Sequence, residues 1–380
     1  MSKDIKFNCL NSDEEERYQK HLTLKEIGYE GQIDIKNSSV LCIGAGGLGS
    51  SVLLYLTASG IGEIGIVDND HVEKSNLQRQ IIHETNNIGN LKIDSARERM
   101  RKLNPNSKLI TFAERINPKN ALEIIRQFDI ICDCSDNFST RYLINDACLI
   151  LKKPLVFGSV QGFEGQVSVF NLHEKSPNLR DLLPESPSKN NVPSCAEYGV
   201  VGVSTGLIGI LQVNEIIKII LKKGEILDGK ILIFDLLNMN MKKLNLKGDQ
   251  INKRIKNLSQ FVDFYCEDEC SDKNKINRIN ANDFNSLYKA KPNKILLIDV
   301  RENEEFSNSA IEGSISIPLS HLSQKPDLEF IQKESLIKEV FTICKSGKRS
   351  EKASKILSKF KIKSRSIEGG IEKVKKLLCN

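Results

Sequence analysis

The sequence lacks a long apolar run, and it lacks an apolar segment near its start. A membrane span requires about 18 or more consecutive apolar residues, and we find no such run. The opening stretch, MSKDIKFNCLNSDEEERYQKH, has no signal core and carries an acidic cluster that is untypical of a transit peptide. We therefore predict no membrane insertion and a cytoplasmic protein, or one of the plastid stroma if it is organelle-encoded.

A strong charge of one sign is also missing. The net charge is +6 and the pI is near 8.6, with lysines interspersed among carboxylates. Proteins that bind nucleic acids usually gather their basic residues in a stripe or patch. We therefore expect no nucleic-acid partner, whereas acidic or phosphate-bearing partners stay possible.

The ten cysteines come without an export signal, so we expect free thiols and no disulfide framework. Cys42, Cys132 and Cys148 lie in apolar runs and are predicted to be core residues. The thiols left as candidates for chemistry are Cys195, Cys344, Cys266 and Cys270.

The length of 380 residues exceeds one ordinary core and predicts two or three domains. Short apolar strands alternate with amphipathic helices between about residues 38 and 235, which predicts an α/β domain with a doubly wound, mostly parallel, Rossmann-like sheet. The expected strands are SVLCIG, EIGIVD, KLITFA, FDIICDCSD and PLVFGSV, and the expected helices cover 47–58, 92–103, 118–127 and 140–152. An antiparallel strand, GQVSVFNL, a proline-containing loop and a buried helix follow.

The rest of the chain predicts a linker and a second, smaller α/β domain. Residues 251–277 are polar, charge-rich and without clear periodicity. Strands KILLIDV, EVFTIC and SRSIEGG then alternate with helical patterns. We predict domains at 1–250 and 278–380.

The segment CIGAGGLGS follows a strand and opens a helix, with Gly44, Gly46 and Gly49 in G-x-G-x-x-G spacing. Such glycines let backbone N–H groups approach a phosphate, and a helix N-terminus favours the anion. Asp68, at the end of the next strand, is placed to accept from ribose hydroxyls. These features alone fit NAD and adenine nucleotides equally.

Cations downstream favour ATP over a dinucleotide. SNLQRQ at 75–80, Lys92 and DCSDN at 133–137 follow in order. Hydride transfer needs no array of cations, whereas carboxylate attack on an α-phosphate builds charge that must be neutralised. Arg79 and Lys92 can supply that charge, and Asp136 is the candidate magnesium ligand.

The motifs GAGGLG, SNLQRQ, DCSDN, EGQVSVF and SCAEYGVVG, in this order, resemble the ubiquitin-activating superfamily in its MoeB/ThiF-type branch. The resemblance, over about residues 13–245, implies a homodimer that uses ATP and magnesium to adenylate the C-terminal glycine of a ubiquitin-like sulfur carrier protein, MoaD-like or ThiS-like. It assigns nucleotide contacts to Gly47, Asp68, Ser75, Asn76, Leu77, Gln78, Arg79, Lys92, Asp136 and Asn137.

Two positions depart from that family. An arginine that reaches into the neighbouring subunit's site is replaced by Lys20, which keeps the charge but loses the bidentate fork. The family binds zinc with two Cys-x-x-Cys pairs. In this sequence Asn178 and Asp181 stand in place of the first pair, and Cys266 and Cys270, near the second, are one residue too far apart. We therefore expect no structural zinc.

Residues 279–380 resemble a rhodanese domain, on the segments DVRE and EGSISIP and on the loop from Cys344 to Arg349. This C-x4-R loop is one residue shorter than the ring of cysteine phosphatases and fits a single sulfur atom. A persulfide on Cys344 would be stabilised by loop amides and by Lys345, Lys348 and Arg349. The prediction requires that Cys344 is not sealed in the core.

Together the resemblances predict an adenylyltransferase and sulfurtransferase. The carrier is adenylated, the Cys344 persulfide attacks the acyl-adenylate, and Cys195 then forms a disulfide with Cys344 and frees a thiocarboxylate. A cysteine desulfurase is the expected sulfur donor. The alternatives left open are an adenylyltransferase whose rhodanese domain is a docking module, a non-catalytic scaffold, and a nicotinamide oxidoreductase with a phosphatase domain.

Overall fold

The computed structural model describes residues 7–184, 199–253, 255, 257, 258, 277–322, 325–360 and 362–378. The chain divides into two compact units, residues 1–267 and 268–380, which are described separately. Ile255 and Leu258, from the segment predicted as a linker, are buried, and Leu258 packs into the core of the first unit. The domain boundaries set from the sequence stay predictions.

The first unit is built on one sheet of order β3-β2-β1-β4-β5-β6-β7-β8. Strands β1 to β5 run parallel, and β6, β7 and β8 join antiparallel at one edge. The predicted doubly wound, mostly parallel sheet is therefore confirmed. The strands are β1 Ser39–Ile43, β2 Glu63–Val67, β3 Lys108–Phe112, β4 Ile130–Asp133, β5 Leu155–Gln161, β6 Glu164–Phe170, β7 Lys230–Asp235 and β8 Asn240–Asn245.

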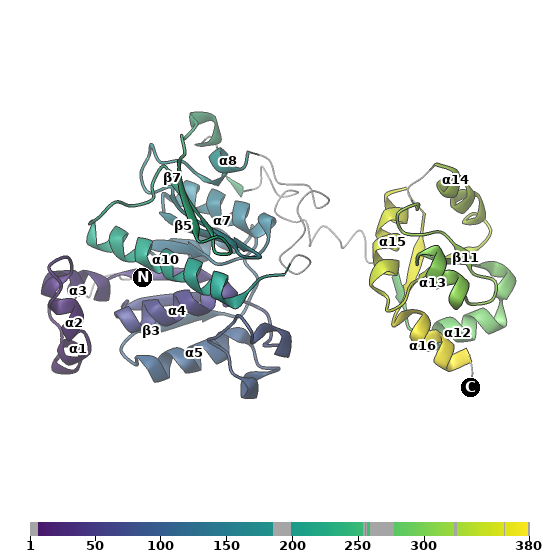
Figure 1. The fold of residues 1–380 in the computed structure, drawn as a ribbon, viewed down its shortest axis with the longest axis horizontal. Helices are drawn as coiled ribbons and strands as arrows, with labels where there is room; N and C mark the ends of the chain where they lie inside the picture. The colour runs from purple at the N-terminus through teal and green to yellow at the C-terminus, as the bar shows by residue number, and fades with distance from the viewer. Residues whose placement is uncertain are drawn as a thin grey trace. The chain divides into compact units, whose positions relative to one another are not determined.

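Helices cover both faces of this sheet (Figure 1). Successive strand residues point to opposite faces, so Val40 and Cys42 pack in one core while Leu41 and Ile43 pack in the other. On the first side lie α4 Gly47–Ser59, α5 Lys92–Leu103 and α10 Gly202–Leu221, and on the second α6 Ala121–Arg126, α7 Phe138–Leu151 and α8 Leu179–Leu182. The sequence patterns missed α1 Ser12–Arg17, α2 Gln19–Leu22, and α3 Gly28–Lys36, which packs on α10.

Helix α10 corrects one expectation. Its 20 residues, with a mean hydropathy of 1.5 over 18 of them, are long and apolar enough to cross a membrane by length and composition. The expectation that no such run exists is therefore wrong. The helix packs against α4, β5 and β6, and its buried Gln212 donates to the Asp133 carbonyl at 2.8 Å, as in the core helix of a folded domain.

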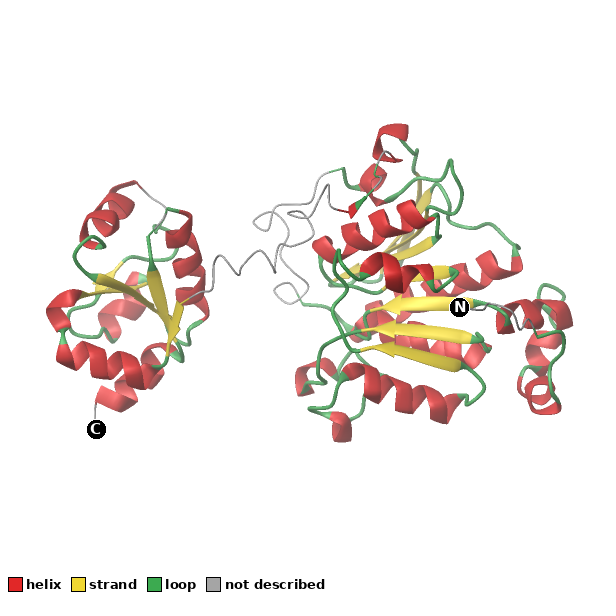
Figure 2. Ribbon diagram, turned by 180° about the vertical axis from the view of Figure 1, so that it is seen from behind, coloured by secondary structure: helices red, strands yellow, loops and turns green. Residues whose placement is uncertain are grey.

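The second unit has a five-stranded parallel sheet of order β11-β10-β12-β13-β9 between helices (Figure 2). Leu296 and Ile298 pack with Leu357 on one face, whereas Leu297 and Phe341 pack on the other. The strands are β9 Asn277–Ile279, β10 Ile295–Asp299, β11 Ile315–Ser316, β12 Glu339–Ile343 and β13 Ser364–Ile367, and the helices are α12 Ala281–Ala290, α13 Asn303–Asn308, α14 Lys325–Glu334, α15 Lys348–Lys359 and α16 Gly370–Leu378. This confirms a smaller α/β domain.

Candidate functional site

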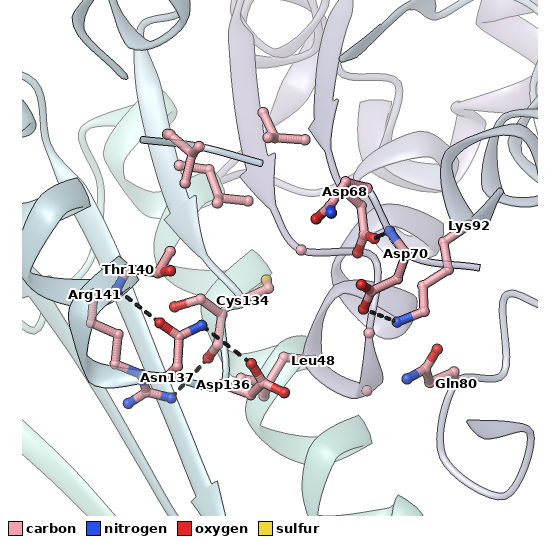
Figure 3. A pocket seen from close by; sticks show the side chains of 18 of the residues that line it. Leu48, Asp68, Asp70, Gln80, Lys92, Cys134, Asp136, Asn137, Thr140 and Arg141 are labelled. Carbon is pink, nitrogen blue, oxygen red and sulfur yellow. Dashed lines mark hydrogen bonds and ion pairs between the residues drawn. The ribbon is translucent and has the colours of Figure 1, made fainter. Parts of the chain in front are cut away.

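A pocket of about 390 Å³ lies at the carboxyl ends of β1, β2 and β4. Strand order reverses between β1 and β4, which is where ligands of open α/β sheets bind. Figure 3 shows Asp68, Asp70, Gln80 and Lys92 on one side and Asp136, Asn137, Thr140 and Arg141 on the other. Six of the residues assigned to the nucleotide line it: Gly47, Asp68, Arg79, Lys92, Asp136 and Asn137.

The glycine-rich turn forms the floor of this pocket. Gly44 has φ +104°, and a Cβ there would lie 2.8 Å from the Cys134 carbonyl oxygen. A Cβ on Gly49 would lie 2.0 Å from the Gly44 carbonyl oxygen. Only glycine fits both positions, so β1 can turn directly into α4. Helix α4 begins at Gly47, a lining residue, so its N-terminus faces the pocket and favours an anion there.

Asp68 holds the turn and faces the pocket. Its carboxylate accepts from the backbone N–H groups of Ala45 and Asp70, both at 2.8 Å. Burial raises the pKa of Asp68, and the nearby Lys92 ammonium opposes that rise. The carboxylate oxygens keep lone pairs for further donors, and the contact with ribose hydroxyls stays a prediction.

Lys92, the first residue of α5, brings a buried cation to the pocket wall. Its side chain is 8% exposed, and its ammonium contacts the Asp70 carboxylate at 2.8 Å. Asp70 is itself 65% exposed. An incoming phosphate would compete with the Asp70 carboxylate for the Lys92 ammonium. Because Asp70 is largely solvated, it can give up the ammonium to the phosphate and be stabilised by water instead.

The segment 75–79 shapes the pocket more than it lines it. Arg79 is the lining residue, and its guanidinium donates to the Ser75 carbonyl at 3.1 Å. Asn76 is buried and accepts from the Glu73 N–H, and the side chain of Gln78 donates to the Val200 carbonyl at 3.5 Å. Ser75, Asn76, Leu77 and Gln78 do not line the pocket as the described residues form it, so their nucleotide contacts stay predictions.

The sequence reasoning missed Gln80, which lines the pocket, and His83, which does not line it but contacts the glycine turn. Gln80 lines the pocket, is 4% exposed, and its Oε1 has no hydrogen-bond partner among the described residues. His83 Nε2 lies 3.0 Å from the Ala45 carbonyl oxygen, and Nδ1 lies 2.9 Å from Ser95 Oγ. A carbonyl only accepts, so Nε2 carries the proton. The quoted run SNLQRQ contained Gln80, and this signal could have found it.

His83 therefore fixes the glycine turn from beneath. Burial lowers its pKa, and the neighbouring Lys92 ammonium lowers it further, while the bond to Ala45 acts in the opposite sense. The turn is held on two sides, by Asp68 at the Ala45 N–H and by His83 at the Ala45 carbonyl. The phosphate-binding backbone is thus positioned before a ligand arrives.

Asp136 and Asn137 follow β4 on the opposite wall. Asn137 caps α7, since its side chain accepts from the Thr140 N–H at 2.9 Å. Asp136 is exposed, and its Oδ1 lies 3.5 Å from Asn137 Nδ2. An exposed carboxylate beside a phosphate site suits magnesium, which takes one or two carboxylates together with phosphate oxygens and water.

Lys20 lies on the exposed surface of α2 and does not line the pocket of its own chain as described. The prediction that it serves a neighbouring subunit's site stays a prediction.

Cys195, Cys266 and Cys270 lie outside the described residues. Cys42, Cys132 and Cys148 are fully buried, which confirms them as core residues, and burial raises the pKa of each thiol. For Cys42 the largest cause is its bond with Cys134.

Cys344 lies at the end of β12, in a tight loop that opens α15. Its Sγ accepts from the Gly347 N–H at 3.2 Å and lies 3.7 Å from Ser350 Oγ. The residue is only 1% exposed and packs in an apolar cluster, so the requirement that Cys344 is not sealed in the core is not met in this structure. The loop is covered by the start of α16, where a Cβ on Gly370 would lie 2.3 Å from the Cys344 carbonyl oxygen.

The surroundings of Cys344 correct part of the predicted cradle. One loop amide, that of Gly347, contacts the sulfur among the described residues. Arg349 forms a two-pronged bond to Glu305 at 2.6 and 2.8 Å, and Lys345 lies 3.9 Å from Glu372. Both cations are therefore paired with carboxylates. The Lys348 side chain lies outside the described part.

Asn178 and Asp181 stand where the resembling family has its first pair of zinc-binding cysteines. In this structure they cap the N-terminus of α8. The Asn178 side chain accepts from the Arg180 N–H, and Asp181 accepts from the Asn178 N–H. Both side chains are thus already used in hydrogen bonds.

Comparison with known families matches residues 18–254 to the ThiF family and residues 280–377 to the Rhodanese-like domain. The chain is 36% identical to "Adenylyltransferase and sulfurtransferase MOCS3" of Drosophila virilis, covering 91% of this chain and 79% of that one. It is 38% identical to "Probable molybdopterin-synthase adenylyltransferase" of Porphyra purpurea, covering 97% and 94%. It is 38% identical to "Probable adenylyltransferase/sulfurtransferase MoeZ" of Mycobacterium tuberculosis, covering 91% and 88%.

Solved structures share the fold of the first unit. The chain matches the crystal structure of E. coli MccB with ATP at a TM-score of 0.56 and 22% identity, over 65% of this chain and 75% of that one. It matches PaaA at a TM-score of 0.55 and 21% identity, over 66% and 78%. By its family matches and its curated relatives, the chain belongs to the ThiF family and carries a rhodanese-like domain after the ThiF region.

Proposed function

We propose that this enzyme adenylates the C-terminal glycine of a ubiquitin-like sulfur carrier protein with ATP and then converts that carboxylate to a thiocarboxylate. The observation that carries the first step is the preformed phosphate turn beside Arg79 and the buried Lys92. The names of two relatives also combine an adenylyltransferase with a sulfurtransferase activity.

In the first step the carrier carboxylate attacks the α-phosphate and pyrophosphate leaves. The backbone of the glycine turn and the N-terminus of α4 bind phosphate oxygens, and Arg79 and Lys92 neutralise the charge that develops. Asp68 orients the ribose. Magnesium held by Asp136 would offset charge on the departing pyrophosphate.

In the second step the outer sulfur of a Cys344 persulfide attacks the acyl-adenylate, releasing AMP and forming an acyl disulfide. The Cys195 thiolate then attacks Cys344 Sγ, so the thiocarboxylate leaves and a Cys195–Cys344 disulfide forms. A thiol reductant must reduce this disulfide before the next cycle. The sulfur donor proposed for loading Cys344 is a cysteine desulfurase.

The burial of Cys344 sets a condition on this step. A persulfide places its outer sulfur about 2.05 Å beyond Sγ, but a donor must first reach the 1% exposed cysteine. Lys345 and Ser346, the exposed residues of the loop, would have to move. The same burial supports the second candidate function, an adenylyltransferase whose rhodanese-like unit only docks partners.

The remaining parts of the proposal concern assembly and setting. A homodimer would bring Lys20 of one subunit to the nucleotide of the other. The reaction is assigned to the cytoplasm or, for an organelle-encoded chain, to the plastid stroma.

The test is mass spectrometry of candidate carriers incubated with the full-length enzyme, ATP, magnesium and a cysteine desulfurase with cysteine. A gain of sulfur for oxygen at the carrier C-terminus is expected and would name the carrier. If carriers are adenylated but never thiolated, the docking function is correct, and if no carrier supports pyrophosphate exchange, the adenylation proposal is wrong.

A further inference from the structure

Two polar pairs in the first unit meet outside the nucleotide pocket, which none of their four residues lines. Asn178 and Asp181 are separated by two residues, and so are Asp249 and Asn252, which lie just before and within the short 3-10 segment Gln250–Lys253 after β8. Asp181 Oδ1 accepts from the Asp249 N–H and from Asn252 Nδ2, both at 2.8 Å. Asp181 Oδ2 accepts from the Asn178 N–H at 2.8 Å. One carboxylate thus joins two segments that are 68 residues apart.

The two segments are in close contact around this carboxylate. A Cβ on Gly248 would lie 3.3 Å from the Lys175 carbonyl oxygen and 3.3 Å from Pro177 Cα. Asn178 is fully buried. Beneath it, the side chain of Arg180 donates to Asp146 at 2.7 and 3.0 Å, which anchors α8 to α7.

The family resemblance implies a zinc ion bound by two Cys-x-x-Cys pairs, and the residues here do not fit one. The two facing pairs carry carboxylates and amides, whereas structural zinc is bound by thiolates and imidazoles. Three N–H groups also point at the Asp181 oxygens, where a cation would need free lone pairs. Within the described part of the chain, no group of three His, Cys, Asp or Glu is placed to hold a metal.

We propose that Asn178, Asp181, Asp249 and Asn252 form a metal-free clasp in place of that zinc site. The partner of the first pair is then Asp249–Asn252, and not Cys266 and Cys270 as the sequence suggested. In sequence, α8 precedes the segment that carries Cys195, and Asp249–Asn252 precedes the link to the rhodanese-like unit. The clasp fixes the points from which both sulfur-carrying segments extend, and it contains no thiol that could take sulfane sulfur.

The test measures metal content and thermal unfolding of the full-length protein, with and without EDTA. Wild type is expected to hold no stoichiometric zinc and to keep its Tm in EDTA. Asp181→Ala orphans three donors, and we expect the Tm to fall by about 4–8 °C. Asp94→Ala, at a half-exposed carboxylate on α5, is the matched control and should shift Tm by no more than about 1–2 °C.

Two further variants separate the clasp from its alternative. Changing Asn178, Asp181, Asp249 and Asn252 together to cysteine is expected to create one zinc site per chain, with a Tm that falls in EDTA. Cys266→Ser with Cys270→Ser should change neither metal content nor Tm. Zinc in wild type that is lost in this double variant, or an Asp181→Ala protein with unchanged Tm, would overturn the proposal.

Discussion

The phosphate turn of the first unit and the cysteine loop of the second share one backbone arrangement, but the first faces an open pocket and the second surrounds a buried sulfur. Each follows a buried parallel strand, each opens a helix, and each turns through a glycine of nearly equal φ, +104° at Gly44 and +103° at Gly347. The first turn opens on a pocket of about 390 Å³. In the second, the Gly347 N–H points at the chain's own Cys344 sulfur at 3.2 Å.

The difference between the open pocket and the closed loop indicates which of the two sites must rearrange during the reaction. In the nucleotide pocket the turn is fixed by Asp68 and His83, so ATP meets a preformed site. In the cysteine loop the sulfur itself occupies the place of the anion, and Arg349 is held by Glu305. Adenylation therefore needs little rearrangement, whereas sulfur loading needs the loop to open.

The largest expected effect comes from a substitution in the cysteine loop of the second unit. Cys344→Ala removes the only sulfur in the loop, so thiocarboxylate formation should fall by roughly a thousandfold or more. Carrier-dependent pyrophosphate exchange should be unchanged, because the nucleotide pocket lies in the other unit. Cys9→Ala, at an exposed thiol, is the control and should leave both activities intact. An unchanged thiocarboxylate yield in Cys344→Ala would establish the docking function instead.

The next largest effect comes from a substitution in the nucleotide pocket of the first unit. Lys92→Ala removes a desolvated cation from the pocket wall, and we expect pyrophosphate exchange to fall by about 10²–10³-fold. Lys102→Ala, on the same helix but exposed and paired with Glu98, is the matched control. Exchange that is as fast in Lys92→Ala as in the control would show that Lys92 serves only its ion pair with Asp70.

The sequence predicted the turn better than it predicted the loop, for a physical reason. The glycines of CIGAGGLGS and the placement of Asp68 and Lys92 follow from local rules for a strand that turns into a helix. Gly44, Gly49 and the N-terminus of α4 appear in the structure as those rules require. The carboxyl ends of parallel strands meet at one edge, which is why side chains from separate motifs converge at the pocket.

Local rules do not reach contacts made across the fold. Cys344 is buried because it packs with residues far away in the sequence, such as Leu296 on β10 and Leu357 on α15. His83 acts on Ala45 from a segment without regular structure, which no periodicity could place. The buried position of α10 likewise depends on the sheet beside it and not on its hydropathy.

His83 allows the preformed turn to be tested by pH. Replacing it by alanine leaves the Ala45 carbonyl without its donor, and we expect the KM for ATP to rise by roughly tenfold. Burial lowers the pKa of His83, so below its ordinary pKa of about 6.5 the unfolded chain binds more protons than the folded one. Wild-type stability should thus fall as the pH drops through 6.5.

Thermal unfolding at pH 8 and pH 5.5 measures this dependence. The loss of Tm between the two should be smaller in His83→Ala than in wild type, because the variant has no buried imidazole to protonate. Equal losses in both proteins would mean that His83 titrates as it does in the unfolded chain. The glycine turn would then not depend on a neutral imidazole.

The smallest effect concerns the ion pair between Arg349 and Glu305 next to the cysteine loop. Its bond to Arg349 lowers the pKa of Glu305 to about 2, but both side chains are about one-third exposed, so the pair stabilises the fold by less than about 1 kcal/mol. That contribution is present above the ordinary pKa of glutamate, about 4.3, and is lost as the pH falls through about 2. Glu305→Gln should therefore hardly change Tm at pH 7. It should nevertheless raise the rate of Cys344 alkylation by a small iodoacetamide reagent a few-fold, because the loop loses a restraint at Arg349. Glu304→Gln, one residue earlier on α13, is the control, and equal alkylation rates in the two variants would show that the Glu305–Arg349 pair does not keep the loop closed.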